Sequence, residues 1–207
     1  MVQKTDSSPR PRGRPRAYDP EAALARALET FWKAGYAATS LDELSAAMGM
    51  NRPSLYAAFG DKRALFLKSL EHYRRQSAAM IRQALADDPP LRTFLARFYA
   101  AALDSYRPGT AGARGCFLVG TATTEAAGDP EVRALLADAV RQLDAALVKR
   151  IRRAAERGEI DRAADPDALA YLASATLHTL AHRARAGQSR AELDAIVAAA
   201  LDVICRR

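Results

Sequence analysis

The sequence predicts an all-α protein of about nine helices, and three observations support this fold class. Ala and Leu recur at helical spacing, whereas the β-branched Val and Ile that favour strands are sparse. Asp-Pro pairs at 19–20, 129–130 and 165–166 each offer an N-cap, a proline at the first helical position and an acidic residue directly after it. Ser40 and Ser189 each begin a capping box, with Glu three residues later. With glycines at the expected helix ends, these signals predict helices over 20–34, 41–48, 52–58, 62–86, 91–106, 115–127, 130–157, 166–186 and 190–205.

Length and composition restrict the class of protein. The chain has 207 residues, 49% of them hydrophobic, which is enough for a packed core and excludes a wholly disordered protein. Its 31 basic residues outnumber 24 acidic ones, and the net charge of +7 favours an anionic partner. The apolar runs are far shorter than the roughly 18 residues of a membrane span, and no secretory leader precedes them. We therefore expect no membrane partner. The two cysteines are too few for a disulfide framework, and we expect a cytoplasmic protein.

Residues 1–16 form a basic arm rich in Pro, Gly and Ser, which we expect to be disordered. Five of its residues are basic and one is acidic, so it carries more than half of the net charge. Its centre, Pro-Arg-Gly-Arg-Pro, is similar to the core of an AT-hook, which lays arginines along narrow A·T minor grooves. Arg12, Arg14 and Arg16 are therefore candidates for DNA contacts. A simple solubilising tail is the alternative.

Residues 17–66 predict a three-helix head that contains a helix-turn-helix at 40–59. Its first helix has an apolar stripe at helical spacing, made of Leu24, Ala27, Leu28 and Phe31. Two short helices follow, joined by Gly49-Met50-Asn51. Helices this short need a platform, which the first helix and the long fourth helix supply. In this arrangement the second short helix enters the major groove of DNA.

The outward side chains of that second short helix favour DNA as its partner. Asn51, Arg52, Ser54 and Tyr56 are hydrogen-bond donors, and the helix holds no acidic residue that phosphates would repel. Pro53 opens the helix together with Arg52. A generic helical hairpin fits the same periodicity and is the alternative.

The run from Ser40 to Phe66 resembles the DNA-binding head of the tetracycline-repressor (TetR) family of transcriptional regulators. Residues 27–36 and Thr39 are similar to the first helix of that head and the turn after it. The close match covers about 50 residues, and beyond it only the length and the helical pattern agree with the family. The resemblance implies a homodimer whose third helices lie in successive major grooves of a near-palindromic double-stranded DNA operator.

Carried over residue by residue, the resemblance implies phosphate contacts for Tyr56 and Lys62. It also implies contacts between the DNA backbone and Thr39 and Ser40, where the second helix begins. Arg52, Ser54 and Asn51 are the best candidates for reading bases, and the guanidinium of Arg52 matches O6 and N7 of guanine. The full set of candidates on the head is Thr39, Ser40, Asn51, Arg52, Pro53, Ser54, Tyr56 and Lys62.

Residues 67–207 predict a ligand-binding and dimerisation domain. The last two helices carry broad, Ala-rich apolar stripes that suit pairing with their copies in a four-helix interface. The alternative is that these stripes only cover their own core. The interface candidates are Leu169, Leu172, Ala173, Thr176, Leu177, Leu180, Leu193, Ile196, Val197, Ala200, Leu201 and Ile204.

Aromatic and apolar residues of the body are candidates for lining a pocket for a small-molecule effector. An aromatic stripe at helical spacing is more often core, so core packing is the alternative for each of them. The helix over 62–86 is long enough to carry motion from such a pocket to the head, which would shift the population between two conformers. The pocket candidates are Phe94, Phe98, Tyr99, Tyr106, Cys116, Phe117, Leu143, Leu147 and His178.

Chemistry beyond binding has little support in the sequence. His178 and His182 have a metal-capable spacing but no evident third ligand, so we expect no metal or other cofactor. Cys116 could sense oxidants or electrophiles, or could be a buried small apolar residue. No phosphate loop or catalytic constellation indicates an enzyme. The sequence therefore predicts a homodimeric, ligand-responsive transcriptional regulator, and the resemblance to the TetR family implies that it is a repressor. The alternative is a helical small-molecule-binding protein or enzyme with no specific DNA target.

Overall fold

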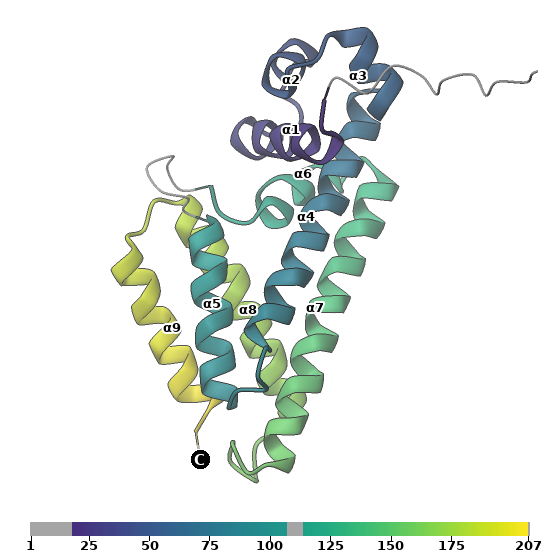
Figure 1. Cartoon of the computed structure of the whole chain (residues 1–207). Helices are drawn as coiled ribbons and strands as arrows, with labels where there is room; N and C mark the ends of the chain where they lie inside the picture. Colours follow the sequence, from purple (N-terminus) through teal and green to yellow (C-terminus); the bar gives the residue numbers. More distant parts are fainter. Residues whose placement is uncertain (1–17, 107–113, 207) are drawn as a thin grey trace, which may run out of the picture.

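The computed structural model describes residues 18–106 and 114–206, and within these ranges the chain is helical without β-strands, as expected (Figure 1). The predicted arm with Arg12, Arg14 and Arg16 lies outside the described residues. Eight of the nine expected helices are present, with ends within two residues of the prediction. None of the described helices is long and apolar enough to cross a membrane. The elements are α1 (Pro20–Ala34), α2 (Leu41–Met48), α3 (Arg52–Phe59), α4 (Lys62–Ala84), α5 (Leu91–Tyr106), η1 (Leu118–Ala122), α6 (Thr123–Glu125), α7 (Pro130–Glu156), α8 (Pro166–Arg185) and α9 (Arg190–Ile204).

The helix expected over 115–127 is the exception, because the structure has the π-helical turn η1 and the short α6 there. The amide of Thr123 donates to the carbonyl of Leu118, five residues back. Close approach of α8 accounts for the irregularity. A Cβ on Gly115, whose φ is +64°, would lie 2.5 Å from the Ala181 carbonyl oxygen, and one on Gly120 would lie 2.8 Å from Nη1 of Arg185. Both glycines therefore allow this segment to pass close to α8.

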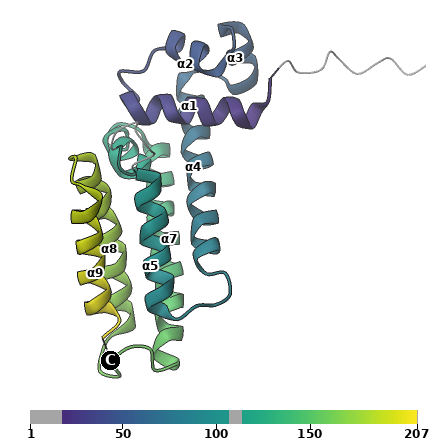
Figure 2. The ribbon, with the colours of Figure 1, turned by 60° about the vertical axis from the view of Figure 1, so that its left-hand side comes forward.

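The head and the body lie at opposite ends of α4 (Figures 1 and 2). Helices α1, α2 and α3 gather around the first turns of α4. The remainder of α4 runs along a body formed with α5, α7, α8 and α9, in which α8 and α9 occupy the flank away from α4. The head is therefore joined to the body through one continuous helix.

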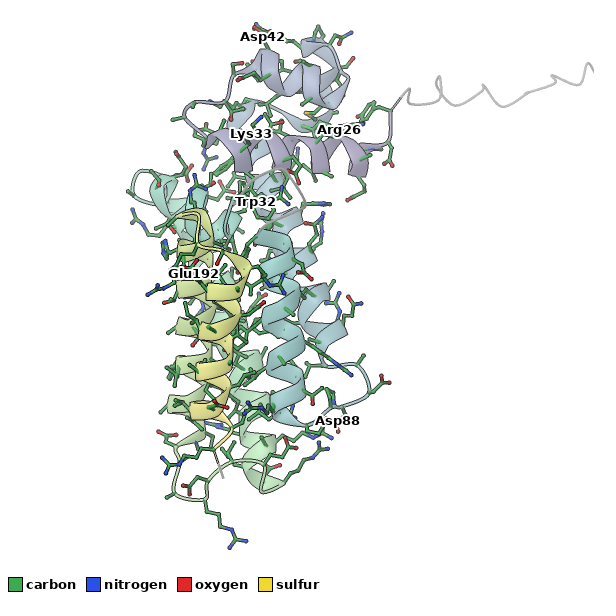
Figure 3. All side chains as sticks on the ribbon, turned by 90° about the vertical axis from the view of Figure 1, so that its left-hand side faces the viewer. Arg26, Trp32, Lys33, Asp42, Asp88 and Glu192 are labelled. Carbon is green, nitrogen blue, oxygen red and sulfur yellow. The ribbon has the colours of Figure 1, made fainter. Side chains whose placement is uncertain are left out.

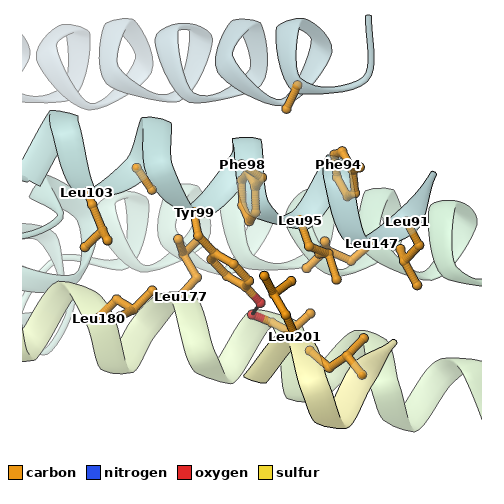
Figure 4. Close-up of a cluster of buried hydrophobic side chains, with 14 of the residues drawn as sticks. Leu91, Phe94, Leu95, Phe98, Tyr99, Leu103, Leu147, Leu177, Leu180 and Leu201 are labelled. Carbon is orange, nitrogen blue, oxygen red and sulfur yellow. Dashed lines mark hydrogen bonds between the residues drawn. The ribbon is translucent and has the colours of Figure 1, made fainter. Parts of the chain in front are cut away.

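Two clusters of buried hydrophobic residues hold this arrangement. The body cluster centres on α5, whose Leu91, Leu95 and Tyr99 face α8 and α9 (Figure 4). The head cluster contains Phe31 and the start of α4, and it also includes side chains from the segment before α7. The head core therefore extends into the top of the body.

The helix-turn-helix is formed by the local signals that the sequence carries. Ser40 and Glu43 form the expected capping box at the start of α2. Gly49 follows α2 in the left-handed conformation at φ +65°, which a residue with a side chain adopts at a cost. Asn51 then caps α3 by accepting a hydrogen bond from the Ser54 amide at 2.9 Å. These caps fix where α3 begins, and the packing of Leu55 and Phe59 in the head cluster sets which of its faces is buried.

Candidate nucleic-acid interface and ligand cavity

The face of α3 that the sequence assigns to DNA points away from the protein. Leu55 and Phe59 of α3 are buried against the head, and the other residues from Asn51 to Ala58 are exposed. Tyr56 keeps 46% of its surface exposed, which makes it one of the few large exposed hydrophobic residues. The exposed candidates therefore share one surface, formed by Asn51, Arg52, Pro53, Ser54 and Tyr56.

The neighbouring residues Thr39 and Ser40 differ in whether their hydroxyl protons are already used in a hydrogen bond. The Thr39 side chain is buried, and its hydroxyl donates to the Gly35 carbonyl at 2.6 Å. A hydroxyl has one proton, so this bond uses the proton of Thr39 within the turn before α2, and a contact between Thr39 and a phosphate stays a prediction. The Ser40 hydroxyl only accepts, from the Glu43 amide at 3.1 Å, so its own proton is available for a phosphate.

Lys62 lies at the first position of α4, next to the same surface. Its ammonium group is 4.5 Å from the centroid of the Tyr36 ring, a distance at which a cation and an aromatic face attract. This contact holds the charge close to the positive end of the α4 dipole, where a phosphate would be bound favourably.

Arg52 makes a contact that the sequence prediction missed. Its Nε donates to Oδ1 of Asp42 at 2.9 Å, and its Nη2 lies 2.7 Å from Oδ2 of the same carboxylate. Asp42 comes from α2, and the helix-turn-helix brings it beside α3 at the end of the head opposite the body (Figure 3). The sequence analysis relied on the absence of acidic residues within α3. That observation could not show that the preceding helix places an acidic residue beside Arg52.

The body contains a cavity of about 510 Å³ between α4, α5, η1, α7 and α8. Five of the nine pocket candidates line it, and the lining is predominantly apolar. The volume lies in the range of sites that hold small molecules. These five candidates are Phe98, Tyr106, Cys116, Leu143 and His178.

The other four pocket candidates do not line this cavity and are packed in the hydrophobic clusters. The hydroxyl of Tyr99 donates to the Ala173 carbonyl at 3.0 Å, on the side of α5 that faces α8 (Figure 4). Phe94 and Leu147 are buried in the same body cluster. Phe117 packs in the head cluster, with ring centroids 5.8 Å from Trp32 and 5.9 Å from Phe66. Helical periodicity shows that these residues are inward, but it cannot tell core from cavity.

Helix α4 supplies a wall of the cavity that the pocket prediction left out. Tyr73, Met80 and Ile81 line it from this helix. Their spacing continues the inward face that begins at Phe66 and Leu70, so the periodicity of α4 was the available signal. The helix that reaches the head therefore also borders the cavity.

Four titratable groups of the cavity, Tyr73, Tyr106, Cys116 and His178, favour their neutral forms. The Tyr73 hydroxyl donates to Sγ of Cys116 at 3.3 Å. Burial raises the pKa of the Cys116 thiol, and it raises the pKa values of Tyr73 and Tyr106 well above their usual value. Burial lowers the pKa of His178, against the opposing effect of Asp144. Near pH 7 these four side chains are therefore uncharged.

The stripes that the sequence assigns to a dimer interface mostly face the protein's own core. Seven of the twelve candidates are buried within the chain, four are partly buried and Leu172 is exposed. Six of the buried seven pack in the body cluster, and the hydroxyl of the seventh, Thr176, donates to the Leu172 carbonyl within α8. The buried seven therefore cover their own core, which is the alternative that the sequence left open. These seven are Ala173, Thr176, Leu177, Leu180, Leu193, Leu201 and Ile204. The partly buried four are Leu169, Ile196, Val197 and Ala200.

Within the described ranges, no group of three or more His, Cys, Asp and Glu side chains could hold a metal ion. His178 is directed to the cavity, whereas His182, one turn later on α8, is exposed. The two histidines therefore do not share one environment.

An exposed helix-turn-helix at one end and a helical body with a cavity at the other are typical of a DNA-binding transcriptional regulator. The family model described as "Bacterial regulatory proteins, tetR family" matches residues 23–68, and "Tetracyclin repressor-like, C-terminal domain" matches residues 90–200. The chain therefore belongs to the TetR family, and it is a DNA-binding transcriptional regulator.

Three similar proteins match between 58% and 91% of this chain. The HTH-type transcriptional repressor ComR of Escherichia coli (strain K12) is 31% identical over 183 residues, which cover 88% of this chain and 87% of ComR. The repressor BdcR of the same organism is 37% identical over 119 residues, 58% of this chain and 59% of BdcR. A cysteine-substituted form of the TetR family regulator CifR, complexed with 26-bp double-strand operator DNA, is 34% identical with a TM-score of 0.76. The match covers 91% of this chain and 98% of that one.

Proposed function

We propose that this protein is a repressor that binds a near-palindromic operator as a homodimer and leaves it when a small molecule occupies the cavity. One observation carries the proposal: the wall of the cavity is bonded directly to the head. The indole N–H of Trp32 in α1 donates to the Gly115 carbonyl at 3.1 Å, and the next residue, Cys116, lines the cavity. A ligand that displaces this segment therefore acts on α1, which supports the helix-turn-helix.

The outward faces of α8 and α9 are the proposed dimer interface, in place of the inward stripes. Three of the four large hydrophobic residues that the described chain exposes lie there, namely Tyr171, Leu172 and Val203. The exposed residues between them on these helices include Ala175, Ala195, Ala198 and Ala199, which permit close approach of two helices. Exposed apolar surface of this kind is typical of an interface between subunits.

The effector that suits the cavity is predominantly apolar and uncharged. Its lining is mostly apolar, and Tyr73, Tyr106, Cys116 and His178 are neutral near pH 7. The guanidinium of Arg74 also borders the cavity, but Glu71 already compensates its charge through two hydrogen bonds of 2.7 Å. Arg82 also lines the cavity, but it is exposed, so water screens its charge. An ionised ligand inside the cavity would therefore lose hydration and gain little from an opposite charge.

Selection of duplexes from a random DNA library by the full-length protein tests the proposal. We expect a near-palindromic sequence bound by two chains. Leu172→Asp should weaken dimerisation and operator binding, whereas Ala134→Asp, at an exposed position of α7, should change neither. A protein that enriches no sequence would contradict the proposal and favour the alternative of a binding protein or enzyme without a DNA target.

Release by an effector is tested with neutral aromatic compounds and their carboxylates, such as 1-naphthol and 1-naphthoate. We expect the neutral member of each pair to raise the unfolding temperature more and to lower operator affinity. Leu143→Trp should fill part of the cavity and reduce both responses, while operator binding without compound persists. Tighter binding of the carboxylates would contradict the proposed ligand class.

The arm is proposed to contact the DNA minor groove or phosphates through Arg12, Arg14 and Arg16. Deletion of residues 1–16 should lower operator affinity and make it less dependent on salt, because fewer counterions are released. An unchanged salt dependence would favour the solubilising tail.

A further inference from the structure

The ion pair between Asp42 and Arg52 leaves one edge of the guanidinium available. A guanidinium presents one edge through Nε and Nη2 and a second through Nη1 and Nη2. Asp42 takes the first edge with both carboxylate oxygens, at 2.9 and 2.7 Å. Among the described residues, Nη1 of Arg52 has no hydrogen-bond partner. The second edge has the fork geometry that matches O6 and N7 of guanine.

The pair has little use as a stabilising contact. The side chains of Arg52 and Asp42 are 54% and 76% exposed. An exposed ion pair contributes little to folding stability, because water screens the attraction and two side chains lose freedom. The carboxylate also lies beside a surface that must approach phosphates, where it opposes DNA binding through charge repulsion. A group that costs affinity and adds little stability is best explained by its effect on the orientation of Arg52.

Asp42 can orient Arg52 because both residues are placed by caps. Asp42 is in the first turn of α2, which Ser40 and Glu43 fix through the capping box. Arg52 is the first residue of α3, directly after the Asn51 cap. Both termini are defined by hydrogen bonds within the helix-turn-helix, so the carboxylate is a fixed partner for a long and otherwise mobile side chain.

We propose that Asp42 is a positioning residue, which holds Arg52 so that its free edge reads a guanine in each half of the operator. This inference rests on the proposed binding of an operator by the exposed face of α3. Without the carboxylate, the guanidinium can turn to neighbouring phosphates, which gives affinity but carries no sequence information. Asp42 therefore lowers the total affinity for DNA and increases the discrimination between bases.

Selection from a random duplex library, followed by competition between single-base operator variants, tests the inference. The full-length wild type should select a guanine whose preference disappears in Arg52→Ala. In Asp42→Ala the preference at that base pair should fall by roughly tenfold, while affinity for non-operator DNA is equal or higher. Asp42→Asn keeps one acceptor and should retain part of the preference. In the Arg52→Ala background, Asp42→Ala should change no base preference, because its effect is exerted through Arg52.

The outcomes separate this inference from the function on which it rests. A wild type that selects no sequence overturns the proposed operator binding, and this inference with it. A selected operator whose guanine preference survives in Asp42→Ala overturns the positioning role alone. An equal loss of affinity for every sequence in Asp42→Ala also overturns it, since that result indicates a damaged head. Thermal unfolding of the variants, expected to be close to wild type, identifies such damage.

Discussion

The head and the body have cores of different kind. In the head, aromatic rings pack edge to face, with centroids 4.9 Å apart for Trp32 and Tyr73 and 5.2 Å apart for Phe31 and Phe66. In the body, leucines and alanines predominate, and the cavity of about 510 Å³ lies beside them. The region that must hold α3 in one position is filled with large interlocking rings, whereas the region proposed to admit a ligand has space. The close packing of the head therefore contrasts with the space in the body, and Tyr73 lies at the boundary, because it packs against Trp32 and also lines the cavity.

The two cores meet in the segment from Arg114 to Phe117. The Arg114 guanidinium lies 3.8 Å from the centroid of the Trp32 ring and is paired with Glu29, also on α1. Trp32 lies at the boundary between head and body (Figure 3). Cys116 packs against both clusters, and Phe117 belongs to the head cluster. A change in the cavity wall can therefore reach α1 through packed groups, without travelling along α4.

The largest expected effect comes from removing a ring at this junction. Phe117→Ala should lower the free energy of unfolding by about 3–5 kcal/mol, because Phe117 is fully buried among Trp32, Phe66 and Tyr73. Phe98→Ala is the matched control in the body and should cost about 1 kcal/mol less, because Phe98 already borders the cavity and loses fewer contacts. Urea unfolding measures both. Equal losses in the free energy of unfolding would show that the two cores are equally well packed.

Enlarging a buried side chain should reveal the same difference in packing between head and body, with a smaller change in the free energy of unfolding. Ala27 is fully buried in the head cluster, so Ala27→Leu should lower the free energy of unfolding by about 1–3 kcal/mol through overpacking. Ala146 lines the cavity, and Ala146→Leu should change stability by less than about 1 kcal/mol because space is available. Urea unfolding again measures both variants. A larger loss for Ala146→Leu would contradict an accessible cavity.

The sequence predicts the head more closely than the body, for physical reasons. Head boundaries depend on local signals, such as the Ser40 capping box and the Asn51 cap, and these are readable without knowledge of tertiary contacts. The sequence cannot show which helices approach one another, so the contact between Asp42 and Arg52, ten residues apart, was not predicted. The same limitation applies to η1, where contact with α8 breaks a regular helix.

The faces of α8 and α9 were misassigned because both sides of these helices are apolar. Tyr171 and Leu172 are exposed while Ala173 and Leu177 are buried, so hydrophobicity alone does not separate the outer face from the inner one. Only some of the residues that line the cavity were predicted, for a related reason. Spacing identifies inward residues, but only the packing of several helices decides whether Phe98 borders space and Phe94 does not.

A polar junction between head and body should respond to acid. Asp129 caps α7 and also receives two hydrogen bonds from Arg63 on α4, at 2.6 and 2.9 Å. The hydrogen bonds from Arg63 are the main cause that lowers the pKa of the Asp129 carboxyl to about 2. A carboxyl whose pKa is lowered by folding stabilises the folded state above its ordinary pKa, and this contribution is lost as the pH falls toward 2.

Asp129→Asn keeps a capping side chain but removes the charge. Its unfolding temperature should lie a few degrees below wild type at pH 7, and the difference should shrink as the pH falls below about 4. Asp165→Asn, at the matching Asp-Pro cap of α8, is the control for changing an aspartate cap. Circular dichroism during heating gives these temperatures. A difference independent of pH would show that the ion pair does not act as described.

The smallest expected effect concerns Cys116, at the boundary of the two cores. Burial raises the pKa of its thiol, so the reactive thiolate is scarce near pH 7. In a Cys205→Ser background, iodoacetamide should modify folded Cys116 several-fold more slowly than the unfolded chain, and the rate should keep rising beyond pH 9. Cys116→Ala should change stability by less than about 1 kcal/mol, because the thiol acts as a small apolar group. A folded-state rate above that of the unfolded chain would contradict the neutral cavity and favour the sensing role for Cys116. The cavity would then be the site of a chemical reaction, and the preference for uncharged ligands would need a different explanation.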